Sequence, residues 1–296
     1  MDQLLREQGR RTVSRADMQR RHDRMAEVSP EVGALDANAL AGVLEEDLDA
    51  GVPLLVDLAR ATDPVLRDRA RRLAASLIVP ACRRPGPSRA GGSARIGPVP
   101  DDGVDLDLDA TMDRLGEHGN LAAMTAGDLR WRGWRRPGRA VVLVVDASGS
   151  VTGAPLHTAV VTAAALAARS GPADEMAVVA FWSRAVVLRH MDDPSPPATV
   201  IERLLVLRGG DTTDLAGGLT AALAQVARAA AARRDVIVLT DGMANEGGDP
   251  LTVAGSAASV GAVVHVLSLN PDEEAVAACR ALAGHGGGRF AALTRP

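Results

Sequence analysis

The sequence predicts an α/β protein with a doubly wound, mainly parallel sheet and a small helical region at its N-terminus. After residue 139, short and almost continuously apolar runs alternate with helical segments, which is typical of parallel strands buried on both faces. Before residue 84, apolar residues recur at three- and four-residue spacing, which favours helices. The 296 residues, 47% apolar and 24% charged, suffice for one large and one smaller domain.

Composition excludes several classes of protein. All 33 basic residues are arginines. A P-loop nucleotidase needs a phosphate-binding lysine and a Schiff-base enzyme needs an amine nucleophile, so both classes are excluded. The formal charge of −4 provides no global basic field for nucleic acid or anionic lipid. Cys82 and Cys279 lack CxxC spacing, which argues against a zinc knuckle and suits a reducing compartment.

The sequence also predicts where the protein is found. No stretch approaches the roughly 20 apolar residues that a membrane helix needs. Residues 1–27 are dense in charged and polar side chains and lack the apolar core of a secretory signal. We therefore expect a cytoplasmic protein with no membrane partner.

Residues 1–84 form the predicted helical region. The charged run over residues 4–24 indicates one exposed helix with a thin apolar stripe. From Asp36 onward, the apolar spacing predicts three short helices packed together, with breaks at residues 51–53 and 63–64.

Two further segments connect this region to the sheet. Residues 85–103 contain four prolines and five glycines and are interpreted as a linker without regular structure. Residues 104–109 alternate apolar and acidic side chains, which indicates a strand with one wet face or an extended entry into a helix at residues 110–116. We expect residues 104–139 to be a lead-in segment that packs on the sheet.

Residues 140–296 form the predicted Rossmann-like sheet domain. The expected buried parallel strands are residues 141–145, 176–181, 236–239 and 262–267. A hairpin leads to an edge strand at residues 186–189, and residues 288–293 form a last strand. The expected crossover helices are residues 156–168, 198–205, 215–232, 251–259 and 273–283.

Oxygen-bearing side chains follow the predicted strands where a doubly wound sheet binds ligands, beyond the carboxyl ends of its strands. They are Asp146, Ser148 and Ser150 after the first strand, Thr213 before the helix at residue 215, and Asp241 after the third strand. Hard oxygen donors without His or Cys suit Mg²⁺, and Mn²⁺ or Ca²⁺ would also suit them. Two carboxylates balance a divalent charge, and the hydroxyls add ligands without charge, so an outside carboxylate could bind the ion.

In combination, these residues resemble a known metal site. The order Asp146-x-Ser148-x-Ser150, then Thr213, then Asp241 in a Leu-Thr-Asp-Gly sequence resembles the metal-ion-dependent adhesion site of von Willebrand factor A (VWA) domains. The resemblance covers about residues 140–293 and implies the VWA fold. It implies that the two serines and the threonine contact the metal and that the aspartates act directly or through water. A partner's acidic residue would complete the coordination, so the implied function is protein recognition.

The segment before the sheet narrows the resemblance. Residues 105–111, followed by the Arg-Arg-Pro-Gly-Arg run at 135–139, resemble bacterial CoxE-like and magnesium-chelatase-like A-domain proteins. Those proteins work beside MoxR-type AAA+ ATPases. The resemblance implies a non-enzymatic adaptor that grips an acidic residue of a client through Mg²⁺. Its helical region would contact a second protein, in client remodelling or in cofactor or metal insertion.

The same residues also have plainer interpretations. Turns favour Asp, Ser and Gly, so the constellation could be a polar rim that binds no metal. Asp211 and Asp214 flank Thr213 and could lie in the outer shell of the metal. Capping the helix that begins at residue 215 is the more common role for a residue placed like Asp214.

A segment rich in arginine and tryptophan supports an alternative function. Interleaved cations and aromatics are typical of stacking on single-stranded nucleic acid, so an RNA- or ribonucleoprotein-binding VWA protein is the alternative. The structural interpretation, which we favour, is a strand or turn whose tryptophans pack on the sheet and whose arginines pair with the preceding acidic run. The residues concerned are Arg130, Trp131, Arg132, Trp134, Arg135 and Arg136.

A Mg²⁺-dependent phosphatase is a further and weaker alternative. A hydrophobic strand that ends in Asp146 resembles haloacid-dehalogenase phosphatases. Those enzymes place a second acid two residues later, where this chain has Ser148, and they generally hold the phosphate with a lysine, which this chain lacks.

Overall fold

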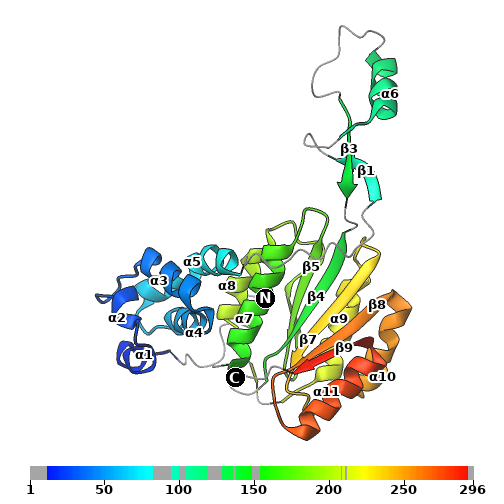
Figure 1. The fold of residues 1–296 in the computed structure, drawn as a ribbon. Coiled ribbons are helices and arrows are strands. Elements are labelled where there is room, and N and C mark those ends of the chain that lie inside the picture. The colour runs from blue at the N-terminus through cyan, green and yellow to red at the C-terminus, as the bar shows by residue number, and fades with distance from the viewer. Residues whose placement is uncertain are drawn as a thin grey trace. The chain divides into compact units, whose positions relative to one another are not determined.

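The computed structural model describes residues 12–82, 95–99, 105–118, 129–135, 138–148, 154–207, 209–210 and 212–292. Packing contacts divide the chain into two compact units, one formed by Met1–Pro85 with Arg139–Pro296 and the other by Gly86–Gly138 (Figure 1). The N-terminal helices therefore share a unit with the large sheet. The four-part division expected from the sequence stays a prediction.

The first unit contains a six-stranded sheet with the strand order β6-β5-β4-β7-β8-β9 (Figure 1). All neighbouring pairs are parallel except β5 and β6, which form an antiparallel hairpin. The expected doubly wound, mainly parallel sheet is confirmed, including the strand that returns to one edge. The strands are β4 (Arg139–Asp146), β5 (Glu175–Phe181), β6 (Ala185–Arg189), β7 (Arg233–Thr240), β8 (Ala262–Ser268) and β9 (Gly287–Ala292).

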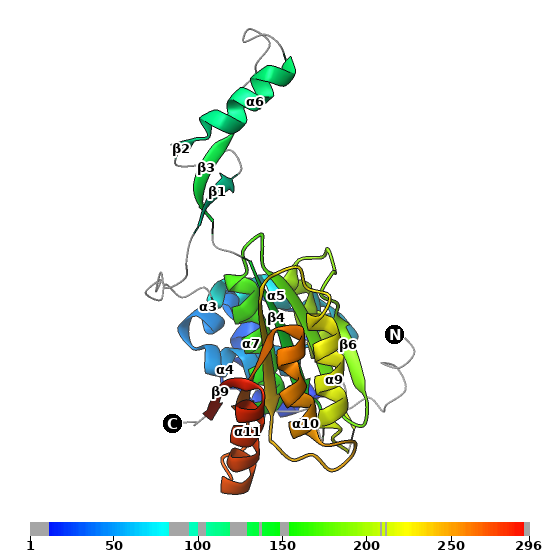
Figure 2. The same cartoon turned by 90° about the vertical axis from the view of Figure 1, so that its right-hand side faces the viewer.

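Helices cover the sheet because its central strands are apolar on both faces. Along β4, Val142 and Val144 join one buried cluster, whereas Leu143 and Val145 join the other, as the two-residue period of a strand requires. One face carries α9 (Leu215–Val226), α10 (Pro250–Gly255), η4 (Ser256–Val260) and α11 (Glu273–His285), which Figure 2 shows in front of the sheet. The other carries α7 (Ala154–Arg169), η3 (Pro197–Thr199) and α8 (Val200–Leu205).

One predicted helix is shorter than expected. The apolar pattern predicts a helix over residues 215–232, but α9 ends at Val226. The N–H groups of Ala230 and Ala231 donate to the Glu175 carboxylate at 3.2 and 2.8 Å. No residue near Val226 in this alanine-rich sequence predicts the end of the helix. The acceptor for these two amides is on β5, which is distant in the sequence, so a local pattern cannot show where α9 ends.

Five short helices form the N-terminal part of this unit: α1 (Arg15–Arg21), α2 (Met25–Val28), α3 (Ala37–Glu46), α4 (Leu48–Leu58) and α5 (Pro64–Ala81). The expectation of three helices after residue 36 is confirmed, but the break expected at residues 51–53 is wrong, because α4 begins after Asp47 and continues through Pro53. Each begins at an aspartate whose carboxylate accepts backbone N–H groups of the first turn, namely Asp36, Asp47 and Asp63.

The single exposed helix expected over residues 4–24 is wrong for the described part of that segment. Helix α1 begins only after Ser14, whose hydroxyl accepts the N–H of Asp17 at 3.1 Å. Residues 1–11 lie outside the described residues. Val13 bridges to Ala61 in an extended conformation, so a long-range pairing replaces a helical turn here.

The N-terminal helices pack directly on the helices of the sheet. A single buried apolar cluster runs from Met18 and Leu58 through Leu156 of α7 to Leu143 of β4. Arg60 donates from Nη2 to the carbonyl oxygen of Leu207 at 3.2 Å, close to the C-terminal end of α8. The helices and the sheet therefore share one hydrophobic core.

The second unit, taken by itself, contains an antiparallel sheet with the order β1-β3-β2 and the helix α6 (Leu108–His118). Its strands are β1 (Arg95–Val99), β2 (Asp105–Leu106) and β3 (Trp131–Arg135). The expectation that residues 85–103 contain no regular structure is wrong, because β1 lies within them. Pro98 is compatible with β1 because β1 is an edge strand, where a residue can lack the ladder N–H.

The alternating segment at residues 104–109 forms only the short strand β2, and α6 begins earlier than expected. Asp107 ends the strand: its N–H donates to the carbonyl of Arg130 at 2.7 Å and its carboxylate accepts the N–H of Ala110 at 3.1 Å. This second bond satisfies an open N–H of the first helical turn.

No helix in the described ranges is long and apolar enough to cross a membrane.

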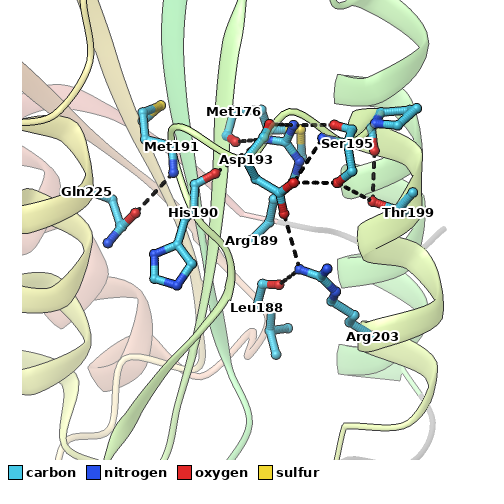
Figure 3. A network of polar contacts seen from close by, with 11 residues as sticks. Met176, Leu188, Arg189, His190, Met191, Asp193, Ser195, Thr199, Arg203 and Gln225 are labelled. Atoms are coloured by element: carbon cyan, nitrogen blue, oxygen red, sulfur yellow. Dashed lines mark hydrogen bonds and ion pairs between the residues drawn. The ribbon is translucent and has the colours of Figure 1, made fainter. Parts of the chain in front are cut away.

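The buried side chain of Arg189 forms hydrogen bonds that stabilise the turn after β6 (Figure 3). The guanidinium of Arg189 donates to the carbonyl oxygens of Met176, of Asp193 at 2.9 Å and of Ser195 at 2.6 Å. Its buried Nε has no hydrogen-bond partner among the described residues. The hydrophobic surroundings lower the pKa of Arg189, because burial disfavours its charge. Carbonyl dipoles and the nearby Asp193 charge offset that burial.

Candidate functional site

Asp146 is the buried last residue of β4, at the carboxyl edge of the sheet. Its Oδ1 accepts the backbone N–H of Ser148 at 2.9 Å, and its Oδ2 accepts the hydroxyl of Thr240 at 2.7 Å. Both oxygens are thus engaged by neighbours, one from its own loop and one from the end of β7. These contacts hold the carboxylate in one orientation.

The environment of Asp146 disfavours an isolated negative charge. Burial raises the pKa of Asp146, hydrogen bonds from Ser148 and Thr240 oppose this effect, and the negative charge of Asp241 raises the pKa further. The two residues lie at the carboxyl ends of the neighbouring strands β4 and β7. A cation between them would neutralise charge that little solvent screens.

Ser148 and Thr213 lie on two loops that meet beside Asp146. Ser148 forms a parallel backbone bridge with Gly210, which precedes Thr213 in the second loop. Thr213 is buried, and its N–H donates to Oδ1 of Asn245 at 2.7 Å. Its carbonyl oxygen accepts the N–H of Asn245 at 3.2 Å. Asn245 lies in a third loop, the one that follows β7, and it holds the backbone of Thr213 through both its N–H and its carbonyl group.

Asp241 follows β7 and begins this third loop. Its Oδ1 accepts the N–H of Met243 at 3.0 Å, which closes a tight turn. Gly242 has φ +82°, and a Cβ at that position would lie 2.7 Å from the carbonyl oxygen of Ala275. Only glycine combines this left-handed conformation with the close approach to α11.

The structure describes four of the five predicted metal ligands, Asp146, Ser148, Thr213 and Asp241. Asp146 ends β4, Ser148 and Asp241 follow β4 and β7, and Thr213 lies in the loop before α9 that bridges to Ser148. Ser150 and Asp211 lie outside the described residues. The described oxygen donors are two carboxylates and two hydroxyls, which fits a hard divalent cation. Within the described ranges, no group of three or more His, Cys, Asp or Glu side chains could hold a metal. The described part of the candidate site has two carboxylates, so its other donors to a metal would be hydroxyl groups.

Asp214 caps α9: its Oδ1 accepts the N–H of Gly217 at 2.8 Å. Its own N–H donates to the carbonyl of Trp182 at 2.6 Å, which fixes the second loop to the end of β5. Sequence reasoning missed Thr240 and Asn245, the residues that orient Asp146 and Thr213. Both lie in the same strand end and loop as Asp241, but no local pattern distinguishes them from ordinary polar turn residues.

The arginine- and tryptophan-rich segment belongs to the second unit. Arg130 and Trp131 are half-buried, and the N–H of Arg130 donates to the hydroxyl of Thr111 at 3.0 Å. Arg132, Trp134 and Arg135 lie in β3, which pairs with β1 and β2, and their side chains are not among those described. Arg136 lies outside the described residues.

The sheet order and the oxygen-rich loops at its carboxyl edge define a VWA-type α/β domain. A family described as "VWA domain containing CoxE-like protein" matches residues 88–285. The chain therefore belongs to the CoxE-like group of VWA-domain proteins.

Solved structures that resemble about half of the chain share little sequence with it. An aerotolerance-related membrane protein from Bacteroides fragilis is 20% identical, with a TM-score of 0.44 over 53% of this chain and 92% of that one. BatB from Bacteroides thetaiotaomicron is 21% identical, with a TM-score of 0.44 over 54% and 92%. The VWA-type domain of the pilus tip protein Mfa5 from Porphyromonas gingivalis is 14% identical, with a TM-score of 0.44 over 53% and 90%. No curated protein matches the chain.

Proposed function

We propose that this chain is a non-enzymatic protein-interaction module whose partner binding depends on Mg²⁺. Asp146, Ser148, Ser150, Thr213 and Asp241 would hold the ion at the carboxyl edge of the sheet. When bound, the ion supplies an electrophilic coordination position for an acidic side chain of another protein. The observation that carries the proposal is the buried carboxylate of Asp146 beside the charge of Asp241, with hydroxyl donors around them.

The other residues of the site act by holding these donors. The N–H of Ser148 and the hydroxyl of Thr240 orient the Asp146 carboxylate. Asn245 holds the backbone of Thr213, so its hydroxyl is presented by a fixed loop. Such contacts behind the ligands commonly tune metal affinity by 10- to 100-fold.

Membership of the CoxE-like family supports a role as an adaptor or accessory subunit of a MoxR-type AAA+ ATPase. The metal site would grip an acidic client, and helices α1–α5 would contact a second protein. The process served would be client remodelling or the insertion of a cofactor or metal. A partner that consumes ATP would work in the cytoplasm, where we expect the complex.

Affinity capture from native lysate tests the partner. The tagged full chain is used in Mg²⁺ and in EDTA, and retained proteins are identified by mass spectrometry. We expect an AAA+ ATPase or its client to be retained only with Mg²⁺, and Ser148→Ala to abolish that retention. Ser256→Ala, which removes an exposed hydroxyl at the end of α10, is the matched control.

Other outcomes contradict the proposal in distinct ways. Mg²⁺-dependent retention by Ser148→Ala would remove the metal site from the contact. Retention in both buffers would move the contact to α1–α5. Capture of RNA and its binding proteins, with a steep loss of binding on adding salt, would favour the alternative function of the arginine- and tryptophan-rich segment.

A further inference from the structure

A fourth loop lies at the same edge of the sheet as the three metal-site loops. It is the hairpin between β5 and β6. Phe181, the last residue of β5, pairs with Asp146, and its carbonyl oxygen accepts the N–H of Ala147 at 2.8 Å. The carbonyl of the next residue, Trp182, accepts the N–H of Asp214 at 2.6 Å. The hairpin therefore contacts both the loop of Ser148 and the loop of Thr213.

The indole of Trp182 has a fixed place in this hairpin. The residue is 6% exposed, and its backbone N–H donates to the carbonyl of Arg184 at 3.0 Å, which closes the turn. A Cβ at Gly210 would lie 2.6 Å from Cδ1 of the indole, so the second loop packs against the ring. Trp182 is thus held from two sides within the rim of the site.

Arg184 is exposed and lies over this ring. Its guanidinium carbon is 5.4 Å from the ring centroid, the separation of a cation–π contact. Within the described ranges, Arg184 forms no ion pair. A guanidinium has five N–H donors, so an exposed one that contacts a ring can still bind a carboxylate. Arg184 therefore presents a cation on the hairpin that contacts the loops of Ser148 and Thr213.

We propose that Arg184 determines partner specificity by binding a second carboxylate of the protein whose first carboxylate enters the metal site. This inference rests on the proposed function, and it defines the partner more narrowly. The partner would present a short segment with two neighbouring acidic residues, rather than an isolated aspartate or glutamate. Trp182 is the positioning residue, since it holds the guanidinium at the rim.

A purely structural role for Arg184 makes a different prediction. If the guanidinium only covered the indole, replacing it would lower thermal stability without changing the choice of ligand. The two roles are therefore separated by comparing ligands with one and two carboxylates on the same variant.

The test uses the purified full chain and phage-displayed random peptides, selected in Mg²⁺ and in EDTA. We expect Mg²⁺-dependent enrichment of peptides with two neighbouring acidic residues. The enriched peptide and a version with one acid replaced by its amide are then titrated by fluorescence anisotropy. The wild-type chain should prefer the two-acid peptide about two- to fivefold, as expected for an exposed ion pair. The preference should weaken at high salt.

Three variants decide the role of Arg184. Arg184→Gln should bind both peptides equally well, and Arg184→Lys should recover part of the preference because it restores the charge. Arg280→Gln is the matched control: its guanidinium carbon lies 5.3 Å from the ring centroid of Phe290, on the edge strand β9. This variant should keep the wild-type preference.

The outcomes distinguish this inference from the proposed function. If peptide binding needs Mg²⁺ but Arg184→Gln retains the two-acid preference, the role of Arg184 is refuted and the metal-dependent interaction stands. If no peptide is enriched, or if enrichment is the same in EDTA, both are overturned. Thermal unfolding of each variant verifies that the chain is folded.

Discussion

At the scale of single residues, two buried charged side chains have opposite roles. Asp146 is a buried carboxylate at the carboxyl edge of the sheet, and the negative charge of Asp241 further disfavours its ionised form. Arg189 is enclosed by carbonyl oxygens at the other end of β5, near Met176. The ionised carboxylate of Asp146 destabilises the metal-free fold, and a bound cation would remove this effect. The guanidinium of Arg189 stabilises the fold through hydrogen bonds within the chain and needs no ligand.

Asp146→Asn should show that cost. Because the pKa of Asp146 is raised above the ordinary value of about 3.9, its ionisation makes the metal-free fold less stable as pH rises from about 4 through the raised pKa, and the loss is constant above it. In EDTA at pH 7, we expect the variant to unfold at the same temperature as the wild type or higher. The difference should vanish as pH falls towards 4. Mg²⁺ should raise the unfolding temperature of the wild type only.

Differential scanning calorimetry across pH, with and without Mg²⁺, measures this effect. A variant that is clearly less stable at pH 7 in EDTA would mean that the hydrogen bonds of Asp146 outweigh its burial. A Mg²⁺-induced stabilisation that survives in the variant would remove Asp146 from the metal site.

Arg189→Met should destabilise the fold and leave the metal site intact. The substitution removes the hydrogen bonds to the buried carbonyl oxygen of Met176 and to the partly buried carbonyl oxygens of Asp193 and Ser195, at a cost of about 3 kcal/mol. Chemical denaturation measures the loss, and calorimetric titration with Mg²⁺ should give an unchanged affinity. In the control Arg228→Met, an exposed ion pair with Asp192 is lost, which costs about 1 kcal/mol or less. Equal losses in the two variants would contradict the role of Arg189.

At the scale of elements, the site depends on how closely its loops approach. The third loop returns at Gly247, which has φ +89°. A Cβ there would lie 2.0 Å from Oδ1 of Asp214, the cap of α9. The loop that carries Asp241 and Asn245 is thereby packed against the residue that follows Thr213.

Gly247→Ala should therefore weaken metal binding without touching a ligand. The methyl group forces the loop away from Asp214 and pulls Asn245 from Thr213, so we expect a Mg²⁺ affinity about tenfold lower by calorimetric titration. Gly284→Ala is the control, because a Cβ there meets nothing within 4 Å on α11. That variant should keep the affinity and gain about 0.5–1 kcal/mol of stability. Wild-type affinity in Gly247→Ala would show that the loop is not coupled to Thr213.

At the scale of the whole molecule, the main feature is the core shared by the N-terminal helices and the sheet. Leu58 of α4 and Leu143 of β4 are fully buried members of the same apolar cluster. A helical region joined in this way is expected to unfold with the sheet and not before it. The segment Gly86–Gly138 forms a unit of its own.

Leu58→Ala should destabilise β4 as well as the helices. Truncating a buried leucine costs about 2–5 kcal/mol, and a shared core spreads that loss across the unit. Hydrogen exchange read by mass spectrometry should show faster exchange in the peptides of both α4 and β4. Val32→Ala, at a residue that is 80% exposed, should leave both unchanged. Faster exchange confined to residues 12–82 would mean that the helices fold independently.

Local patterns in the sequence predict most of the elements and the loops that carry the site. The buried strands β4, β5, β7 and β8 appear as apolar runs because both of their faces are covered. Asp146, Ser148, Thr213 and Asp241 could be named because the site draws its donors from loops at strand ends, which the alternation of elements already locates. The edge strand β1, which contains Pro98, lacks such a pattern, since its partner β3 is more than thirty residues away.

The sequence by itself determined the class of fold, the order of its strands along the chain and the chemical type of the candidate ligands. Only the tertiary structure decided that Thr240 and Asn245 hold those ligands and that Glu175 ends α9. It also decided that the N-terminal helices complete the core of the sheet and that the guanidinium of Arg184 lies over the ring of Trp182. Periodicity and turn chemistry arise between neighbouring residues and can be recognised locally. These contacts join residues that are close only after folding, or side chains with no periodic pattern, so no local pattern identifies them.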